Sequence, residues 1–95
     1  MTVEELLRTL EKMSSELASS GFENVDPKTM EKLREIALKA GELQMKEGKH
    51  LTENVISCIK AIQDGRSKIQ SGYLRLTALD FYLKNFPESD FIEDI

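Results

Sequence analysis

A heptad repeat from Val55 to Phe86 constrains the fold of this chain more than any other feature of the sequence. With Val55 taken as heptad position a, every a and d position holds an apolar residue or glycine: Val55, Cys58, Ile62, Gly65, Ile69, Gly72, Leu76, Leu79, Leu83 and Phe86. The repeat crosses the segment DGRS, residues 64–67, without a change of phase. Such a repeat predicts helical structure that buries one face against other helices, as in a coiled coil.

The segment 64–67 allows two interpretations. In the first, residues 53–86 form one continuous helix that stops before Pro87. Gly65 and Gly72 then leave gaps in the helix surface, which we call notches. Gly65 lies opposite Ile36, and Gly72 lies opposite the neighbourhood of Met30. An interior glycine costs only roughly 1 kcal/mol relative to alanine, which the burial of the repeat outweighs. In the second, Gly65 ends one helix, and the capping-box spacing of Ser67 and Gln70 begins another. The unbroken heptad phase favours the continuous helix, and the turn stays open as the alternative.

Two earlier helices carry clear start signals. Thr2 and Glu5 have the spacing of a capping box, and the first helix is expected to end at Gly21. Asp26 is a good N-cap for the second helix, and Pro27 suits a first helical turn.

The connection that follows each of these helices is less sharply marked. Phe22 and Val25, in the first connection, are expected to lie beneath the bundle. The second helix is expected to end near Gly48, within KEGKH, and Thr52 to cap the third. The predicted fold class is therefore all-α. It is a small antiparallel three-helix bundle with a long C-terminal third helix, or a four-helix bundle if the chain turns at Asp64–Ser67.

Length and composition predict a single domain. The chain has 95 residues, of which 40% are apolar and 32% charged. We expect one helical domain over residues 1–86 and an acidic, flexible tail over 87–95. Apolar runs are too short to cross a membrane, and the acidic start MTVEELLRTL argues against a secretory signal. The single Cys58 fits a reducing compartment, so the expected location is cytoplasmic.

Charge is unevenly distributed along the sequence. Residues 1–26 carry six acids and two bases, residues 27–86 carry seven acids and eleven bases, and the tail carries four acids. The acidic first helix can lie against the more basic middle. Alternatively, the middle offers a basic surface over residues 28–49 to an acidic partner such as nucleic acid, through Lys28, Lys32, Arg34, Lys39, Lys46 and Lys49.

The sequence contains no recognisable catalytic or metal-binding pattern. His50, the only histidine, lies in the lysine-rich segment KEGKH, and Cys58 occupies a heptad core position. There is no CxxC, HExxH, glycine-rich phosphate loop or EF-hand spacing. We therefore expect a non-enzyme without catalytic residues, cofactor, metal or small-molecule substrate.

Two short segments resemble parts of known helical motifs. IALKAG, residues 36–41, resembles the start of a DNA-binding helix-turn-helix, but Glu42 and Glu47 stand where that motif requires apolar residues. Residues 40–62 resemble one tetratricopeptide unit, but the spacing has one residue too many and Asn54 replaces a small residue. No family is assigned on these segments.

A continuous third helix would extend well past its shorter neighbours and leave its far end uncovered. The predicted partner-binding residues at that end are Tyr73, Leu76, Leu79, Phe81, Tyr82, Leu83 and Phe86. Uncovered apolar surface of this extent normally marks an interface. The predicted function is a protein–protein interaction module, such as a small adaptor, a secretion-type chaperone or a phage-type regulator. The expected assembly is a homodimer of antiparallel third helices or a complex with another protein, and a nucleic-acid-associated regulator is the alternative.

Overall fold

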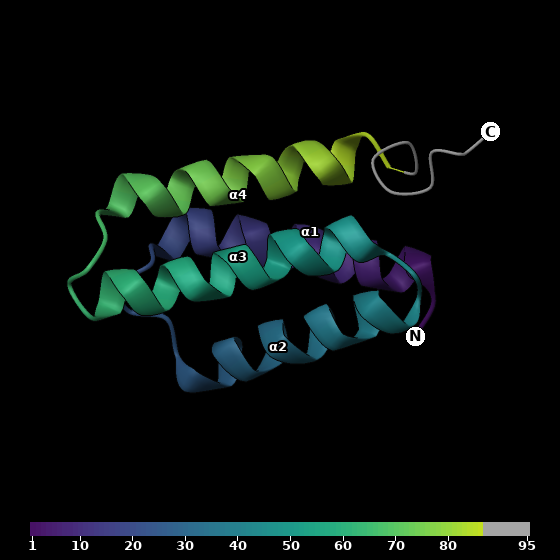
Figure 1. Ribbon diagram of the computed structural model, residues 1–95, viewed down its shortest axis with the longest axis horizontal. Coiled ribbons are helices and arrows are strands. Elements are labelled where there is room, and N and C mark those ends of the chain that lie inside the picture. Colours follow the sequence, from purple (N-terminus) through teal and green to yellow (C-terminus); the bar gives the residue numbers. More distant parts are fainter. Residues whose placement is uncertain (87–95) are drawn as a thin grey trace.

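The computed structural model describes residues 1–86, which form four α-helices (Figure 1). They are α1 (Val3–Ser20), α2 (Pro27–Glu42), α3 (Lys46–Gln63) and α4 (Ile69–Lys84). No strand occurs within residues 1–86, so the predicted all-α class is confirmed. None of the four helices is long and apolar enough to cross a bilayer. The tail predicted for 87–95 lies outside the described residues.

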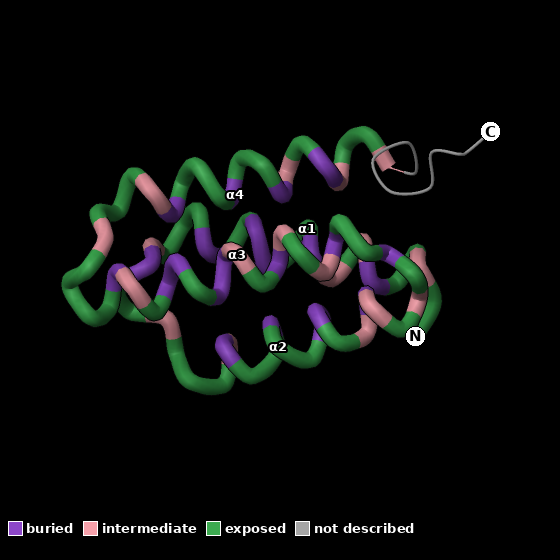
Figure 2. Tube along the Cα trace, viewed as in Figure 1, coloured by how far each residue is buried: buried purple, intermediate pink, exposed green. Residues whose placement is uncertain are grey.

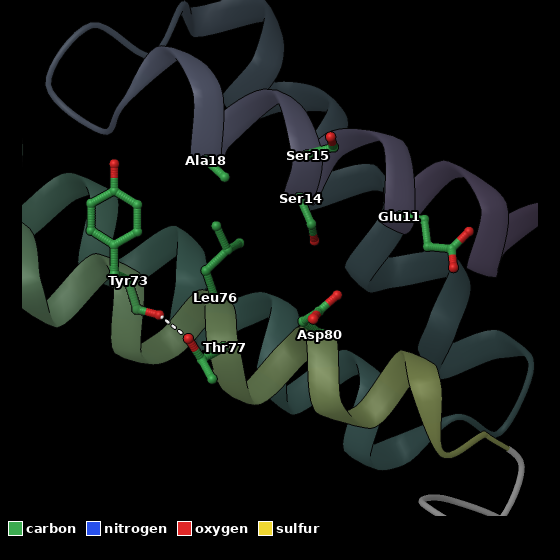
Figure 3. Close-up of a pocket in the computed structure, with 8 residues that line it drawn as sticks. All are labelled: Glu11, Ser14, Ser15, Ala18, Tyr73, Leu76, Thr77 and Asp80. Atoms are coloured by element: carbon green, nitrogen blue, oxygen red, sulfur yellow. Dashed lines mark hydrogen bonds between the residues drawn. The ribbon is translucent and has the colours of Figure 1, made fainter.

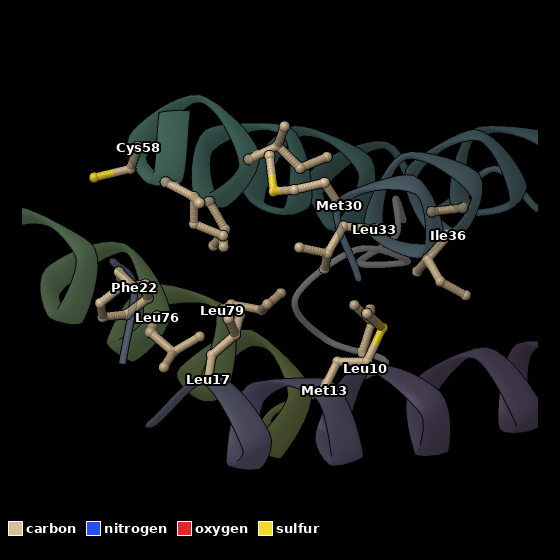
Figure 4. Close-up of a cluster of buried hydrophobic side chains, with 14 of the residues drawn as sticks. Leu10, Met13, Leu17, Phe22, Met30, Leu33, Ile36, Cys58, Leu76 and Leu79 are labelled. Carbon is tan, nitrogen blue, oxygen red and sulfur yellow. The ribbon is translucent and has the colours of Figure 1, made fainter. Parts of the chain in front are cut away.

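Successive helices run in opposite directions and close into a bundle (Figure 1). The second helix packs on α3, α3 packs on α4, and α1 contacts both α4 and α2. The residues coloured as buried lie along the inner side of each helix (Figure 2). The fully buried residues include Leu6, Leu10, Leu33, Met45, Ile59 and Leu79. Part of this core is drawn in Figure 4.

The predicted starts of α1 and α2 are confirmed. The backbone N–H of Glu5 donates to the Thr2 hydroxyl at 3.1 Å, and the Thr2 N–H donates to the Glu5 carboxylate at 2.9 Å. The bond from the Thr2 N–H lowers the pKa of Glu5, because it favours the charged carboxylate. The Asp26 side chain accepts from the Lys28 N–H at 2.9 Å. Both helices therefore begin where their local capping signals predict.

The continuous helix over 53–86 is wrong, and the alternative turn is correct. Helix α3 ends at Gln63, and Gly65 adopts the left-handed conformation with φ +75°. The Gly65 N–H donates to the Ile62 carbonyl at 3.1 Å, and the Arg66 N–H donates to the Ala61 carbonyl at 2.8 Å. This pair of bonds is a Schellman motif, which ends a helix. The N-cap of α4 is Lys68, without a side-chain cap, so the predicted Ser67 cap is not formed.

The turn between α2 and α3 also differs from the prediction. It lies at residues 43–45 and not at Gly48, and Gln44 is left-handed with φ 65°. Gln44 and Met45 donate their N–H groups to the carbonyls of Gly41 at 3.1 Å and Ala40 at 2.8 Å. This is the same Schellman arrangement, with glutamine where glycine is usual.

The predicted cap of the third helix is wrong for the same reason. Thr52 lies inside α3 and is fully buried. Its hydroxyl donates to the Gly48 carbonyl at 2.8 Å. The segment KEGKH is thus the first part of α3, and the left-handed residue of the turn, Gln44, precedes the predicted Gly48 by four residues.

Of the two predicted glycine notches, only Gly72 is one. A Cβ atom on Gly72 would lie 2.8 Å from two ring carbons of Phe22 and 3.0 Å from the Ile62 Cδ1 atom. The group facing the notch is therefore Phe22 from the α1–α2 connection and not the Met30 region. Phe22 is buried as expected, and its ring also packs edge-on to Tyr73, with centroids 4.9 Å apart. A Cβ on Gly65 would meet nothing within 4 Å.

Candidate protein-binding surface

Helix α4 is apolar on two opposite sides, unlike an ordinary surface helix. Its inner side places Leu76, Leu79 and Tyr82 in the core, with exposed fractions of 6%, 1% and 2%. Its outer side carries Leu74 and Phe81, which are 71% and 68% exposed. They are seven residues apart, so they lie two turns apart on one face. The exposed Ala78 lies between them.

We call Leu74, Ala78 and Phe81 the α4 strip. In the heptad frame that begins at Val55, both large side chains occupy position f, which faces away from the a and d core. A polar residue is the usual occupant of such a position. Large apolar residues at successive f positions are therefore the sequence signal for this surface.

The structure separates the seven predicted partner-binding residues into three groups. Leu76, Leu79 and Tyr82 are buried in the chain's own core, because α4 folds back onto α3 and α1. Leu83 and Phe86 are half-buried and pack against that core. Only Tyr73 and Phe81 are exposed, and Leu74, absent from the predicted set, is more exposed than either. The overhanging helix end that led to this set does not exist, since the chain turns at 64–68.

A groove of about 320 Å³ runs between α1 and α4 (Figure 3). Its α1 wall consists of Glu11, Ser14, Ser15 and Ala18, and its α4 wall of Tyr73, Leu76, Thr77 and Asp80. Leu76 and Ala18 lie in the middle of the groove, while Glu11, Ser14 and Asp80 gather towards one end (Figure 3). The groove therefore combines an apolar middle with an acidic end.

Ser14 is the one buried side chain among the described residues whose polar atom has no hydrogen-bond partner. The residue is 7% exposed, and its hydroxyl points into the space between α1 and α4 (Figure 3). Leaving a buried hydroxyl unsatisfied costs about 1–3 kcal/mol. An unpaired polar group of this kind calls for an explanation at this position.

The two carboxylates at the groove end differ in their surroundings. Asp80 forms an ion pair with Lys84 at 3.1 Å, and both side chains are about half or more exposed to solvent. Within residues 1–86, no ion pair is formed by Glu11, which is exposed on α1. Thr77 uses its hydroxyl to donate to the Tyr73 carbonyl at 2.8 Å. The acceptors facing the end of the groove are therefore mainly those of Glu11, Ser14 and Asp80.

The α4 strip borders this groove directly. Thr77, in the groove wall, lies three residues after Leu74 and four before Phe81. Residues at these spacings are neighbours on a helix surface. A segment that covers the strip can therefore reach the groove.

The basic residues proposed as a nucleic-acid surface do not form an unbroken strip. Along α2, the exposed acids Glu31, Glu35 and Glu42 recur at helical spacing between the basic positions. On α3, Lys49 is paired with Glu53 at 3.3 Å. The basic set itself is exposed or half-exposed, and consists of Lys28, Lys32, Arg34, Lys39, Lys46 and Lys49.

His50 and Cys58 both lie on α3. His50 is exposed and Cys58 is buried and free. In the described part of the chain, no cluster of three or more histidine, cysteine or acidic side chains is arranged to hold a metal ion.

Comparison with known proteins returned no matching family model, no matching curated protein and no matching solved structure.

Proposed function

We propose that this chain is a non-enzymatic protein–protein interaction module that binds a partner protein through the α4 strip. The observation that carries the proposal is the exposure of Leu74 and Phe81, at 71% and 68%, on one face of a helix whose opposite face already supplies the core. Folding does not require apolar side chains on that outer face. A contiguous apolar strip without an internal role is typical of an interaction site.

The spacing of the strip suits a helical partner. Leu74, Ala78 and Phe81 follow the i, i+4, i+7 pattern by which helices meet apolar grooves and other helices. Phe81 is a large aromatic anchor, and aromatic residues contribute strongly to binding energy at interfaces. Tyr73, which is 42% exposed, extends the contact towards the groove.

The proposed role is that of a small adaptor, a secretion-type chaperone or a phage-type regulator in the cytoplasm. The cytoplasmic location is proposed because the single cysteine, Cys58, is buried and free. Recognition by such a module needs only a folded surface, and the bundle supplies a rigid helix for it.

The test compares two matched sets of surface variants. Leu74→Gln combined with Phe81→Gln removes the strip and keeps good helix propensity. Leu38→Gln is the control, because Leu38 is 59% exposed on α2, away from the strip. The wild-type chain and both variants are immobilised, exposed to native cell extract and cross-linked, and the retained proteins are identified by mass spectrometry.

We expect a partner that cross-links to the wild-type chain and to Leu38→Gln, but not to the double variant. Circular dichroism should show equal helicity for all three chains. A partner that the double variant retains in full would contradict the proposal, as would one that Leu38→Gln loses equally.

A further inference from the structure

We propose that the groove between α1 and α4 binds a lysine side chain of the partner that covers the α4 strip. This inference rests on the proposed interaction function and specifies the chemistry of the partner. Its carrying observation is the buried hydroxyl of Ser14, which has no partner among residues 1–86 and points across the groove towards Asp80, with Glu11 on the same α1 wall (Figure 3).

The shape of the groove matches the two parts of a lysine side chain. Ala18 and Leu76 line its middle, and the acidic residues stand at one end. Lysine combines an apolar four-carbon stem with a charged head, so its stem packs on apolar surface while its ammonium group reaches polar groups. A volume of about 320 Å³ accommodates one such side chain with water.

Ser14 distinguishes this groove from an ordinary acidic surface. Its hydroxyl is buried, aimed into the groove and without a hydrogen-bond partner among residues 1–86. The lone pairs of a hydroxyl oxygen can accept a hydrogen bond from an ammonium group. A bound lysine therefore satisfies a hydroxyl that the described part of the chain leaves unpaired.

The arrangement of acceptors favours ammonium over guanidinium. Glu11 and Ser14 approach from α1 and Asp80 approaches from α4, so the acceptors come from different directions. Ammonium has three donors that can point in different directions, whereas the donors of arginine are fixed in a plane. The existing Asp80–Lys84 pair is solvent-exposed, and such pairs exchange partners at little cost.

The first part of the test is a titration of the full chain, labelled with ¹⁵N, with Nα-acetyl-lysine-N-methylamide. The matched control is Nα-acetyl-norleucine-N-methylamide, which has the apolar stem without the ammonium group. We expect the lysine compound to shift the amide signals of residues 11, 14, 77 and 80, and the norleucine compound to leave them unchanged. Equal shifts with both compounds, or shifts spread evenly over the chain, would overturn the proposal.

The second part uses variants of the groove. Glu11→Gln and Asp80→Asn should each weaken the binding of the lysine compound by about threefold or more, as expected for a partly exposed charged contact. Ser14→Ala should weaken it by a similar factor, because it removes a hydrogen-bond acceptor. Glu31→Gln, an exposed change on α2, is the control and should leave the affinity unchanged. Unchanged affinity in both carboxylate variants would refute the inference.

Failure of this inference can be distinguished from failure of the proposed function. If the lysine compound does not bind in the groove, but the partner no longer cross-links to the Leu74→Gln, Phe81→Gln chain, the lysine site is refuted and the proposed interaction function is still supported. If the partner still cross-links to the chain that lacks the α4 strip, the proposed function itself is refuted.

Discussion

At the residue scale, Ser14 is a buried polar group that has no hydrogen-bond partner among residues 1–86. We predict that Ser14→Ala raises the free energy of unfolding by roughly 1 kcal/mol, because it removes an unsatisfied buried hydroxyl and introduces a better helix former. Ser15→Ala is the control, since Ser15 is an exposed neighbour on the same helix and reports helix propensity alone. Urea denaturation measures both values. A smaller gain at Ser14 than at Ser15 would show that the Ser14 hydroxyl is satisfied.

Gly72 is a second residue whose role depends on a close contact. A Cβ there would lie 2.8 Å from the Phe22 ring, so we expect Gly72→Ala to destabilise the chain despite its higher helix propensity. Gly72→Leu should cost about 1–3 kcal/mol or more through overpacking. Thermal unfolding of each variant gives the sign directly, and a stability gain from both would contradict the packing of Phe22 against this glycine.

The same contact can be isolated with a double-mutant cycle. Phe22→Leu shortens the facing side chain and should reduce the cost of Gly72→Ala. Additive effects of the two substitutions would show that they do not touch. Coupled effects would confirm that the ring of Phe22 occupies the space that a side chain at position 72 would need.

At the scale of elements, two turns use one hydrogen-bond pattern with different residues. Both the α2–α3 and the α3–α4 turns are Schellman motifs, with Gln44 and Gly65 at the left-handed position. A left-handed residue with a Cβ is strained by roughly 1–2 kcal/mol, while glycine is not. Exchange between glutamine and glycine should therefore change the stability of the chain in opposite directions at the two turns.

We predict that Gln44→Gly stabilises the chain by roughly 0.5 kcal/mol, since relief of strain exceeds the added flexibility of the unfolded chain. Gly65→Gln should destabilise it by about 1 kcal/mol for the converse reason. Chemical denaturation at equilibrium measures both changes. Effects of the same sign at the two sites would mean that the turns differ in conformation.

These turns also mark the limit of what the sequence predicts about the elements. Thr2, Asp26 and Gly21 act on their immediate neighbours, so the helix ends that they define could be located from local chemistry. Gln44 could not, because glutamine carries no preference for the left-handed conformation that it adopts. The turn at Gly65 is difficult to predict from the sequence for a different reason. The residues between α3 and α4 preserve the heptad phase, so two antiparallel helices produce the pattern of one long helix.

At the scale of the whole molecule, the candidate site was only partly accessible from the sequence. The apolar content of residues 73–86 places the predicted partner-binding residues on α4, but which of them the chain's own core covers depends on where the chain turns. Once it turns, Leu76, Leu79 and Tyr82 enter the core and Leu74 and Phe81 remain outside. The groove could not be predicted at all, because it joins Glu11 and Asp80 across two helices that meet only when the bundle closes.

The assembly state follows from how much apolar surface the closed bundle leaves uncovered. The predicted homodimer depends on a long overhanging helix that needs a second copy to cover it, and the turn at residues 64–68 removes that overhang. What remains exposed on α4 is the strip of Leu74, Ala78 and Phe81 with Tyr73 and Ile69, and Met1 and Leu38 are the other large apolar side chains exposed among residues 1–86. Stable interfaces bury about 800 Å² on each partner, which is more than so few side chains supply.

We therefore predict a monomer of 10.8 kDa in solution at tens of micromolar, measured by light scattering or sedimentation equilibrium. A partner protein must then contribute contacts that a second copy lacks, and a lysine directed into the acidic end of the α1/α4 groove is such a contact. Association through that lysine should weaken as salt is added, because part of the attraction is electrostatic and screened. The apolar contact with the strip should persist. A dimer that dissociates when Leu74 and Phe81 are replaced by glutamine would instead show that the strip pairs with itself, and that a second copy of the chain occupies the surface assigned to a different protein.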